Sequence, residues 1–201
     1  MIANPRDNPP TLEGTHLIVR PTVANDALEF LKVAPLETFE YFVSSVPSAA
    51  TPEGFEPFLR YMLETPSVLS FTIIEKSSGA VVGSSSYLDI RPEDDHVEVG
   101  LTWYTPASRG TFVNPEAKLL LLTYAFETLS CIRVTLKCDE RNERSKAAIL
   151  KLGAKYEGTL RKHRTMHSGF VRDTTYFSIL ADEWPAVKAG LESRIQQYGS
   201  V

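Results

Sequence analysis

The chain has 201 residues, of which 43% are hydrophobic and 23% are charged, a composition typical of a folded domain rather than a disordered chain. The net charge of −4 argues against a nucleic-acid-binding surface. No apolar run approaches the roughly 20 residues that span a bilayer, and residues 1–10 lack the basic and apolar regions of a signal peptide. We therefore expect a cytoplasmic protein with no nucleic acid or membrane partner, a flexible segment over residues 1–11 and one domain over 12–201.

The charge is divided unevenly along the chain. Residues 1–130 contain 8 basic and 17 acidic side chains, whereas residues 131–201 contain 13 basic and 8 acidic ones. One interpretation is that the two halves attract a cation and an anion. The other is a solvated surface with uneven charge.

Apolar periodicity predicts one strand and two helices in the first third of the chain. The strand covers 17–20, and a helix follows Asn25 and Asp26. The side chains expected to face inward from this helix are Leu28, Phe30 and Leu31. A second helix begins at 51–53 with proline in its first turn.

Three strands are predicted next, because residues 68–75, 80–90 and 96–104 are rich in β-branched, aromatic and serine residues. The first two read as a hairpin that turns at 77–79. The third alternates Val97, Val99, Leu101 and Trp103 on one face.

The second half predicts crossover connections. Asn114 caps a buried helix that runs to Leu129, a strand covers 132–137, and Asn142 caps a helix that ends at Gly153. Strands over 154–164 and 170–180 precede a last helix that opens at 182–185. The order β-α-α-β-β-β-α-β-α-β-β-α indicates a mixed α/β domain with a mostly antiparallel central sheet flanked by helices.

Two helix starts are candidate anion sites. Residues 105–113 join a strand to a helix through a glycine, and the unpaired first-turn amides of a helix favour negative charge. Asn142-Glu143-Arg144-Ser145 opens the next helix. Each segment taken alone is better explained by an ordinary connection or an ordinary cap, but both starts follow neighbouring strands and could face one cleft.

Metal and disulfide chemistry are not expected. Cys131 and Cys138 flank one strand, so their side chains point apart. His163 and His167 have no carboxylate at ligand spacing, although both could touch a substrate near the last hairpin.

A family resemblance rests on two segments. Arg109–Lys118, followed by a leucine-rich helix with Tyr124-Ala125-Phe126, resembles the acetyl-CoA motif of the GNAT superfamily of N-acetyltransferases. Residues 142–161 resemble its second motif, particularly in the RimJ and RimL branch of ribosomal-protein N-terminal acetyltransferases. The matching positions are Asn142, Ser145, Ala148-Ile149, Leu152-Gly153-Ala154, Glu157-Gly158 and Leu160-Arg161. Leu12-Glu13-Gly14, Leu17 and Arg20-Pro21 match the way that branch opens, so the resemblance covers about residues 12–185.

The resemblance implies a GNAT-like fold and direct acetyl transfer from acetyl-CoA to an amine. Glu98 is the expected general base, because it lies on the strand beside the expected thioester. Ser145 matches the serine that protonates the departing thiolate, and Asn142 would bind the pantetheine arm or order the loop. A backbone amide of Leu101, Thr102 or Trp103 would stabilise the oxyanion. The expected pyrophosphate contacts are Arg109, Gly110, Thr111, Val113 and Asn114. Lys118, Arg144 and Lys146 are either nucleotide-phosphate partners or surface charges.

One position departs from the family pattern. Phe112 stands where the pyrophosphate loop usually has glycine, so its ring either turns away from the ligand or weakens the site. The alternative function is therefore a catalytically weakened module that binds or senses CoA. A Rossmann-type enzyme is discounted, because no G-x-G-x-x-G follows a strand. The acceptor is expected to be a protein N-terminus, a polyamine or another small amine, and the apolar C-terminal hairpin could pair across a homodimer.

Overall fold

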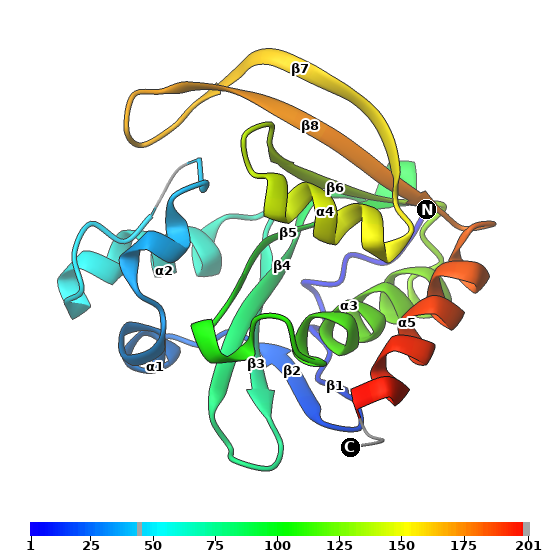
Figure 1. Cartoon of the computed structure of the whole chain (residues 1–201), viewed down its shortest axis with the longest axis horizontal. Helices are drawn as coiled ribbons and strands as arrows, with labels where there is room; N and C mark the ends of the chain where they lie inside the picture. Colours follow the sequence, from blue (N-terminus) through cyan, green and yellow to red (C-terminus); the bar gives the residue numbers. More distant parts are fainter. Residues whose placement is uncertain (44–45, 199–201) are drawn as a thin grey trace.

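A twisted sheet with helices on both faces organises the chain, as the computed structural model of residues 1–43 and 46–198 shows (Figure 1). The strands are β1 (Leu12–Glu13), β2 (Leu17–Pro21), β3 (Leu69–Glu75), β4 (Val81–Arg91), β5 (His96–Tyr104), β6 (Arg133–Asp139), β7 (Lys155–Thr165) and β8 (Val171–Leu180). The α-helices are α1 (Asp26–Val33), α2 (Pro52–Glu64), α3 (Val113–Thr123), α4 (Glu143–Leu152) and α5 (Trp184–Tyr198). Short 3-10 turns cover Leu36–Phe39, Pro92–Asp94 and Pro106–Ser108. The predicted order of elements is confirmed, with the short strand β1 added at its start.

The sheet is mostly antiparallel, as expected. Its strand order is β1-β2-β3-β4-β5-β6-β8-β7, and the one parallel pair among the described strands is β5 with β6. A parallel pair needs a crossover connection, and α3 supplies it. The predicted mixed α/β class is therefore confirmed.

Two apolar cores lie on opposite faces of the sheet. The main core packs under α3, α4 and α5, and the second lies under α1 and α2 (Figure 1). In α1, Phe30 is fully buried and meets the ring of Trp103 edge-on at 5.1 Å. The prediction that Leu28 faces inward is wrong, because this helix turns Phe30 to the core and leaves Leu28 53% exposed.

Helix α3 begins and ends differently from the prediction. It starts at Val113, and Asn114 does not cap it, because the Asn114 side-chain oxygen accepts a hydrogen bond from the Tyr104 hydroxyl at 3.0 Å. The Thr111 hydroxyl instead accepts the Val113 amide at 3.3 Å. At its other end α3 passes into a π-helical turn over Tyr124–Thr128, so the expected regular helix to Leu129 is interrupted.

The first residues of the chain contact the folded body. Ile2 belongs to the main core, Arg6 donates to the Thr65 carbonyl at 2.8 Å, and the Met1 amine pairs with Asp95 at 2.8 Å. The flexibility of residues 1–11 remains a prediction, against which these contacts argue. None of the helices in the described ranges is long and apolar enough to cross a membrane.

Strand β7 forms one edge of the sheet, and its hairpin with β8 arches over the rest of the molecule (Figure 1). Tyr156 and Leu160 on this strand are 59% and 48% exposed. Pairing of this edge across a dimer stays a prediction.

Candidate active site

Strands β5 and β6 diverge in the middle of the sheet, and this divergence places the candidate site. The two strands pair from His96 with Arg133 to Glu98 with Thr135. Beyond that rung β5 pairs only with β4, and β6 only with β8. Paired strands lie about 4.8 Å apart, so the loss of pairing opens a wedge whose vertex is at Glu98.

The Glu98 carboxylate is buried and paired. Val97 and Val99 point into the main core, so Glu98 points to the opposite face, toward α2. Glu98 is only 6% exposed, and one of its carboxylate oxygens, Oε2, lies 2.6 Å from the Lys137 Nζ. Burial raises the pKa of Glu98 above its ordinary value, and Lys137 only partly offsets this. An exposed strand glutamate is therefore ruled out.

Gly100 keeps space beside this carboxylate. A Cβ atom at residue 100 would lie 2.7 Å from a methyl of Leu88 and 3.2 Å from the Glu98 Oε1. The first distance is too short for a side chain without movement of Leu88. The glycine therefore leaves room beside the carboxylate oxygen that Lys137 does not hold.

A β-bulge follows directly on β5. Ser84 pairs with Trp103 and Ser86 with Gly100, so Leu101 and Thr102 together face one residue of β4. Leu101 has a φ of +46°, a left-handed conformation that costs a leucine about 1–2 kcal/mol. A bulge re-aims backbone groups out of the ladder. The residues predicted to supply the oxyanion donor thus lie on irregular backbone, while the Trp103 side chain is buried in the second core.

Lys118 lies beneath this bulge. Its Nζ donates to the Thr102 hydroxyl at 2.7 Å and to the Ser85 hydroxyl at 3.2 Å. Burial lowers the pKa of Lys118 to about 7. The residue is only 5% exposed, so the interpretation as a surface charge is wrong.

The loop before α3 holds the predicted pyrophosphate contacts, and several of their side chains already have protein partners. Arg109 donates to the Tyr104 carbonyl at 3.2 Å and to the Thr38 hydroxyl at 3.2 Å. The Thr111 hydroxyl donates to the Ser108 carbonyl at 2.8 Å. Gly110, with a φ of +76°, makes the turn that only glycine adopts easily. An anion here would therefore meet backbone amides more than side chains.

The Phe112 ring turns away from the loop. It packs on the main core and lies 4.8 Å from the His16 ring, centroid to centroid. Its backbone is right-handed helical, with φ −62° and ψ −18°. This conformation suits any residue, so the position does not require glycine.

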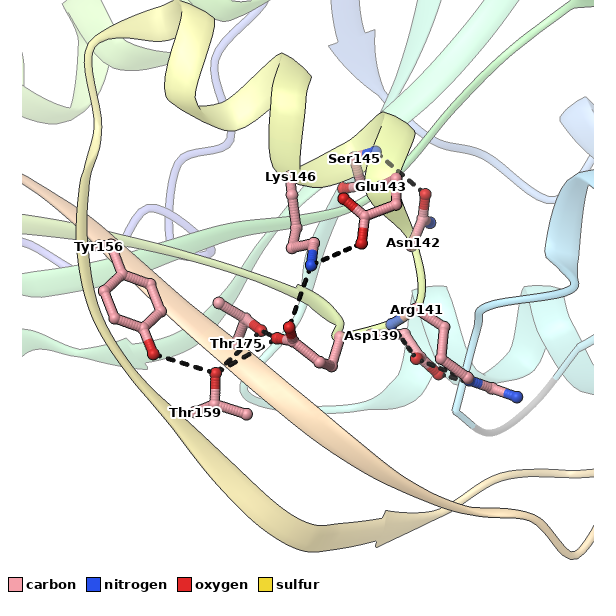
Figure 2. Close-up of polar contacts among 10 residues, drawn as sticks. Asp139, Arg141, Asn142, Glu143, Ser145, Lys146, Tyr156, Thr159 and Thr175 are labelled. Carbon is pink, nitrogen blue, oxygen red and sulfur yellow. Dashed lines mark hydrogen bonds and ion pairs between the residues drawn. The ribbon is translucent and has the colours of Figure 1, made fainter.

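The start of α4 brings the second motif to the end of β6. Asn142 caps the helix as predicted, because its side-chain oxygen accepts the Ser145 amide at 3.0 Å (Figure 2). The Ser145 hydroxyl hydrogen-bonds the Cys138 thiol; burial nevertheless raises the pKa of that thiol to about 11. Cys138 lies three residues beyond Thr135 on β6, about 10 Å along the strand from the vertex.

An ion-pair network ties α4 to the last hairpin (Figure 2). Lys146 pairs with Glu143 at 2.8 Å and with Glu140 at 3.0 Å, and Glu140 accepts hydrogen bonds from Thr159 and Thr175. The Lys146 ammonium therefore already pairs with two carboxylates of the protein, whereas the Arg144 side chain is exposed on α4.

Lys137 and Gly100 were not predicted from the sequence. Lys137 carries a readable signal, because it alternates with the buried Val134, Leu136 and Cys138 along β6 and therefore shares the face of Thr135. Which residue it pairs with depends on the register of β5 and β6, which no local pattern specifies.

Comparisons with known proteins bear on this arrangement. Residues 16–155 match the family model described as the acetyltransferase (GNAT) domain. The chain is 30% identical over 110 residues to the candidate ribosomal N-acetyltransferase YdaF of Bacillus subtilis strain 168, a match that covers 55% of this chain. It covers 59% of that relative, or less than two thirds of its length.

Solved structures resemble the whole fold. A candidate acetyltransferase from T. thermophilus is 37% identical, with a TM-score of 0.87 over 96% of this chain and 99% of that chain. A GCN5-related N-acetyltransferase from Brucella melitensis is 27% identical, with a TM-score of 0.88 over 97% of this chain and 89% of that one.

Proposed function

Since the chain belongs to the GNAT acetyltransferase family, we propose that it transfers an acetyl group from acetyl-CoA to a primary amine by direct attack. The observation that carries this proposal is the buried Glu98 carboxylate at the vertex where β5 and β6 part. The name of YdaF adds the N-terminus of a ribosomal protein to the acceptors to be considered.

The reaction must first remove a proton from the amine, because a free alkyl ammonium has a pKa of about 10. The proposal assigns this task to Glu98, and two observations support it: the position at the vertex, and a raised pKa, which makes the carboxylate a stronger base. Lys137 holds Oε2, so Oε1, on the side of Gly100, is the oxygen that takes the proton.

The amine nitrogen then bonds to the acetyl carbon, and the thioester C–S bond breaks. A backbone amide of the bulge at Leu101–Trp103 would stabilise the transient oxyanion, since pre-aimed amides act most strongly where charge develops. The sulfur leaves as a thiolate, and the attacking nitrogen loses its second proton as it becomes an amide. Ser145 at the start of α4 would relay a proton to the sulfur and be reprotonated by the one that the nitrogen releases. The amides of 110–114 would hold the pyrophosphate, with Asn142 ordering the loop beside the pantetheine arm.

The test is release of free CoA thiol from acetyl-CoA in the presence of a panel of primary amines. We expect thiol release that requires both the protein and an amine, with an N-acetylated product detected by mass spectrometry. Folded protein that binds acetyl-CoA in calorimetry but releases no thiol with any amine would favour the sensing module. Phe112 no longer motivates that alternative, because its ring packs on His16.

A further inference from the structure

Three cationic side chains and two rings gather on the face of the sheet that carries Glu98 and is turned toward α2. We call Lys137, His163, Arg164, Arg172 and Tyr176 the acceptor-side cluster. Strands β6, β7 and β8 supply it, all from the basic C-terminal part of the chain. None of these residues except Lys137 contacts a group assigned to the transfer step.

Strand register brings the cluster together. Tyr176 pairs with Lys137, and Arg172 pairs with Arg164. Residues two and four apart on a strand share a face, so Arg172 lies on the same face of β8 as Tyr176. The Lys137 Nζ lies 5.0 Å from the centre of the Tyr176 ring, and the His163 ring lies 5.8 Å from it.

Arg172 is the most unusual member, because it is a buried guanidinium. It is 8% exposed, and it donates to the Thr174 hydroxyl at 3.1 Å and to the Tyr41 carbonyl at 3.0 Å. Its second terminal nitrogen has no acceptor within residues 1–43 and 46–198. Burial lowers the pKa of Arg172, but an arginine keeps its charge in proteins. A buried charge without an opposite partner is costly.

The carboxylates nearest to this cluster already have other partners. Glu98 pairs with Lys137 at 2.6 Å, and Asp139 pairs with Arg141 at 2.7 Å. Across the part of the chain that the structure describes, neither Arg164 nor Arg172 forms an ion pair with a carboxylate. Among the described residues, Arg172 therefore has only the longer-range attraction of Asp139 and Glu98, and the exposed Arg164 lies on the same face without an ion-pair partner.

We propose that the acceptor is an amine that carries a carboxylate, with its amine at Glu98 and its carboxylate at Arg172 and Arg164. This inference rests on the proposed acetyl transfer and specifies its second substrate. A guanidinium recognises a carboxylate through two parallel hydrogen bonds, and one terminal nitrogen of Arg172 has no acceptor among the described residues. A polyamine would instead bring further positive charge to a site that already has an excess of it.

The carboxylate has two sources, a free amino acid or an acidic residue near a peptide N-terminus, and the experiment separates them. Thiol release is measured with the amidated tripeptides Ala-Asp-Ala, Ala-Asn-Ala and Ala-Lys-Ala, and with alanine against alaninamide. We expect kcat/KM for Ala-Asp-Ala to exceed that for Ala-Lys-Ala by about tenfold or more, or alanine to exceed alaninamide similarly. Added salt should reduce the preference.

Matched variants locate the effect. Arg164→Gln should lower the preference for the carboxylate acceptor several-fold, measured as the ratio of kcat/KM for Ala-Asp-Ala to that for neutral Ala-Asn-Ala in the same variant. Arg161→Gln, on the same exposed strand, removes the same charge outside the cluster and should leave the preference intact. Arg172→Lys, checked by thermal unfolding because the residue is buried, should also lower the preference.

Three outcomes decide the matter. Equal or faster turnover of Ala-Lys-Ala and alaninamide by a working enzyme would overturn the carboxylate inference and leave acetyl transfer standing. An equal loss of preference in Arg161→Gln and Arg164→Gln would overturn the assignment to this cluster. No thiol release with any amine would overturn the proposed function itself.

Discussion

Two lysines with little exposure contact residues of β5, and their pKa values are shifted in opposite directions. Lys118 reaches from α3 to two hydroxyls, and burial lowers its pKa to about 7. Lys137 reaches from β6 to the Glu98 carboxylate; burial lowers its pKa, but Glu98 raises it more, so that the pKa ends above its ordinary value. The difference teaches that a carboxylate partner, rather than depth alone, decides whether a buried lysine stays charged. Lys118 donates hydrogen bonds to the β-bulge and can lose its proton, whereas Lys137 stays charged and pairs with the Glu98 carboxylate.

The largest expected effect is on stability and comes from Lys118→Met. The folded-state pKa is depressed, so both states bind the proton below about pH 7 and the folded state bears the full cost of burying it. As pH rises from about 7 to 10.5, the unfolded state binds more protons and the wild type gains stability. The free energy of unfolding of Lys118→Met, relative to that of the wild type, should therefore fall by about 4–5 kcal/mol over that range.

Urea unfolding of both proteins at several pH values measures this difference, and the subtraction cancels the titration of all other groups. Lys118→Arg, which stays charged, is the control that should show no such recovery. A difference that does not change with pH would mean that Lys118 is not a buried titrating group.

Next in size is the loss of the carboxylate itself. Glu98→Gln keeps the shape of the side chain but removes the base, and kcat/KM should fall by roughly 100-fold or more. The dissociation constant for acetyl-CoA, measured by calorimetry, should stay near that of the wild type. A rate that is unchanged would point to another carboxylate or a chain of water molecules as the base.

Removing Lys137, the partner of Glu98, should lower kcat/KM less than removing Glu98 does. In Lys137→Met the buried Glu98 loses the cation that lowers its pKa, so its pKa should rise further. The acid limb of the pH profile of kcat/KM should therefore move to higher pH, with the plateau at high pH kept. Lys118→Met should leave that limb in place. A shift of equal size in both variants would contradict the conclusion that Lys137 alone of the two lysines sets the pKa of Glu98.

Ser145→Ala should lower kcat by about tenfold or less, because a thiolate is a stable leaving group that needs little help from an acid. The same change removes the hydrogen bond that lowers the pKa of Cys138, so the pKa of that thiol should rise. Rates of thiol alkylation against pH measure the second effect. A lower pKa for Cys138 in the variant would contradict this contact.

The smallest effect on the candidate site is expected for Phe112→Gly. The ring packs on His16 and the main core, so its loss should destabilise the fold by about 1–3 kcal/mol. Affinity for acetyl-CoA should change little, because the ring is turned away from the loop. Markedly tighter binding would show that the side chain obstructs the site.

Local signals in the sequence predicted much of this molecule. Helix α4 begins at the Asn142 cap and ends at the left-handed Gly153, with a φ of +100°, as predicted. Caps are predictable because they depend on neighbours a few residues away. The position of Glu98 on its strand was also readable from alternation. Its burial was not, because burial depends on α2 and β6 rather than on β5.

The remaining features depend on contacts between distant segments. Lys118 is compatible with a surface charge in the sequence, and only the packing of α3 buries it. Leu28 and Phe30 are both compatible with an apolar helix face, and the position of Trp103 decides between them. Similarly, Asn114 is a good cap by type, but Tyr104 engages its side chain.

One contact far from the transfer chemistry also fixes the order in which the molecule can assemble. The Glu116 carboxylate on α3 accepts the backbone amides of His16 and Leu17 at 2.7 and 3.0 Å, and a Cβ at Gly14 would lie 2.3 Å from the same oxygen. The partners are about a hundred residues apart, so their meeting closes a long loop, which slows folding. During synthesis, β2 must therefore wait for α3 to leave the ribosome before this carboxylate can satisfy its amides.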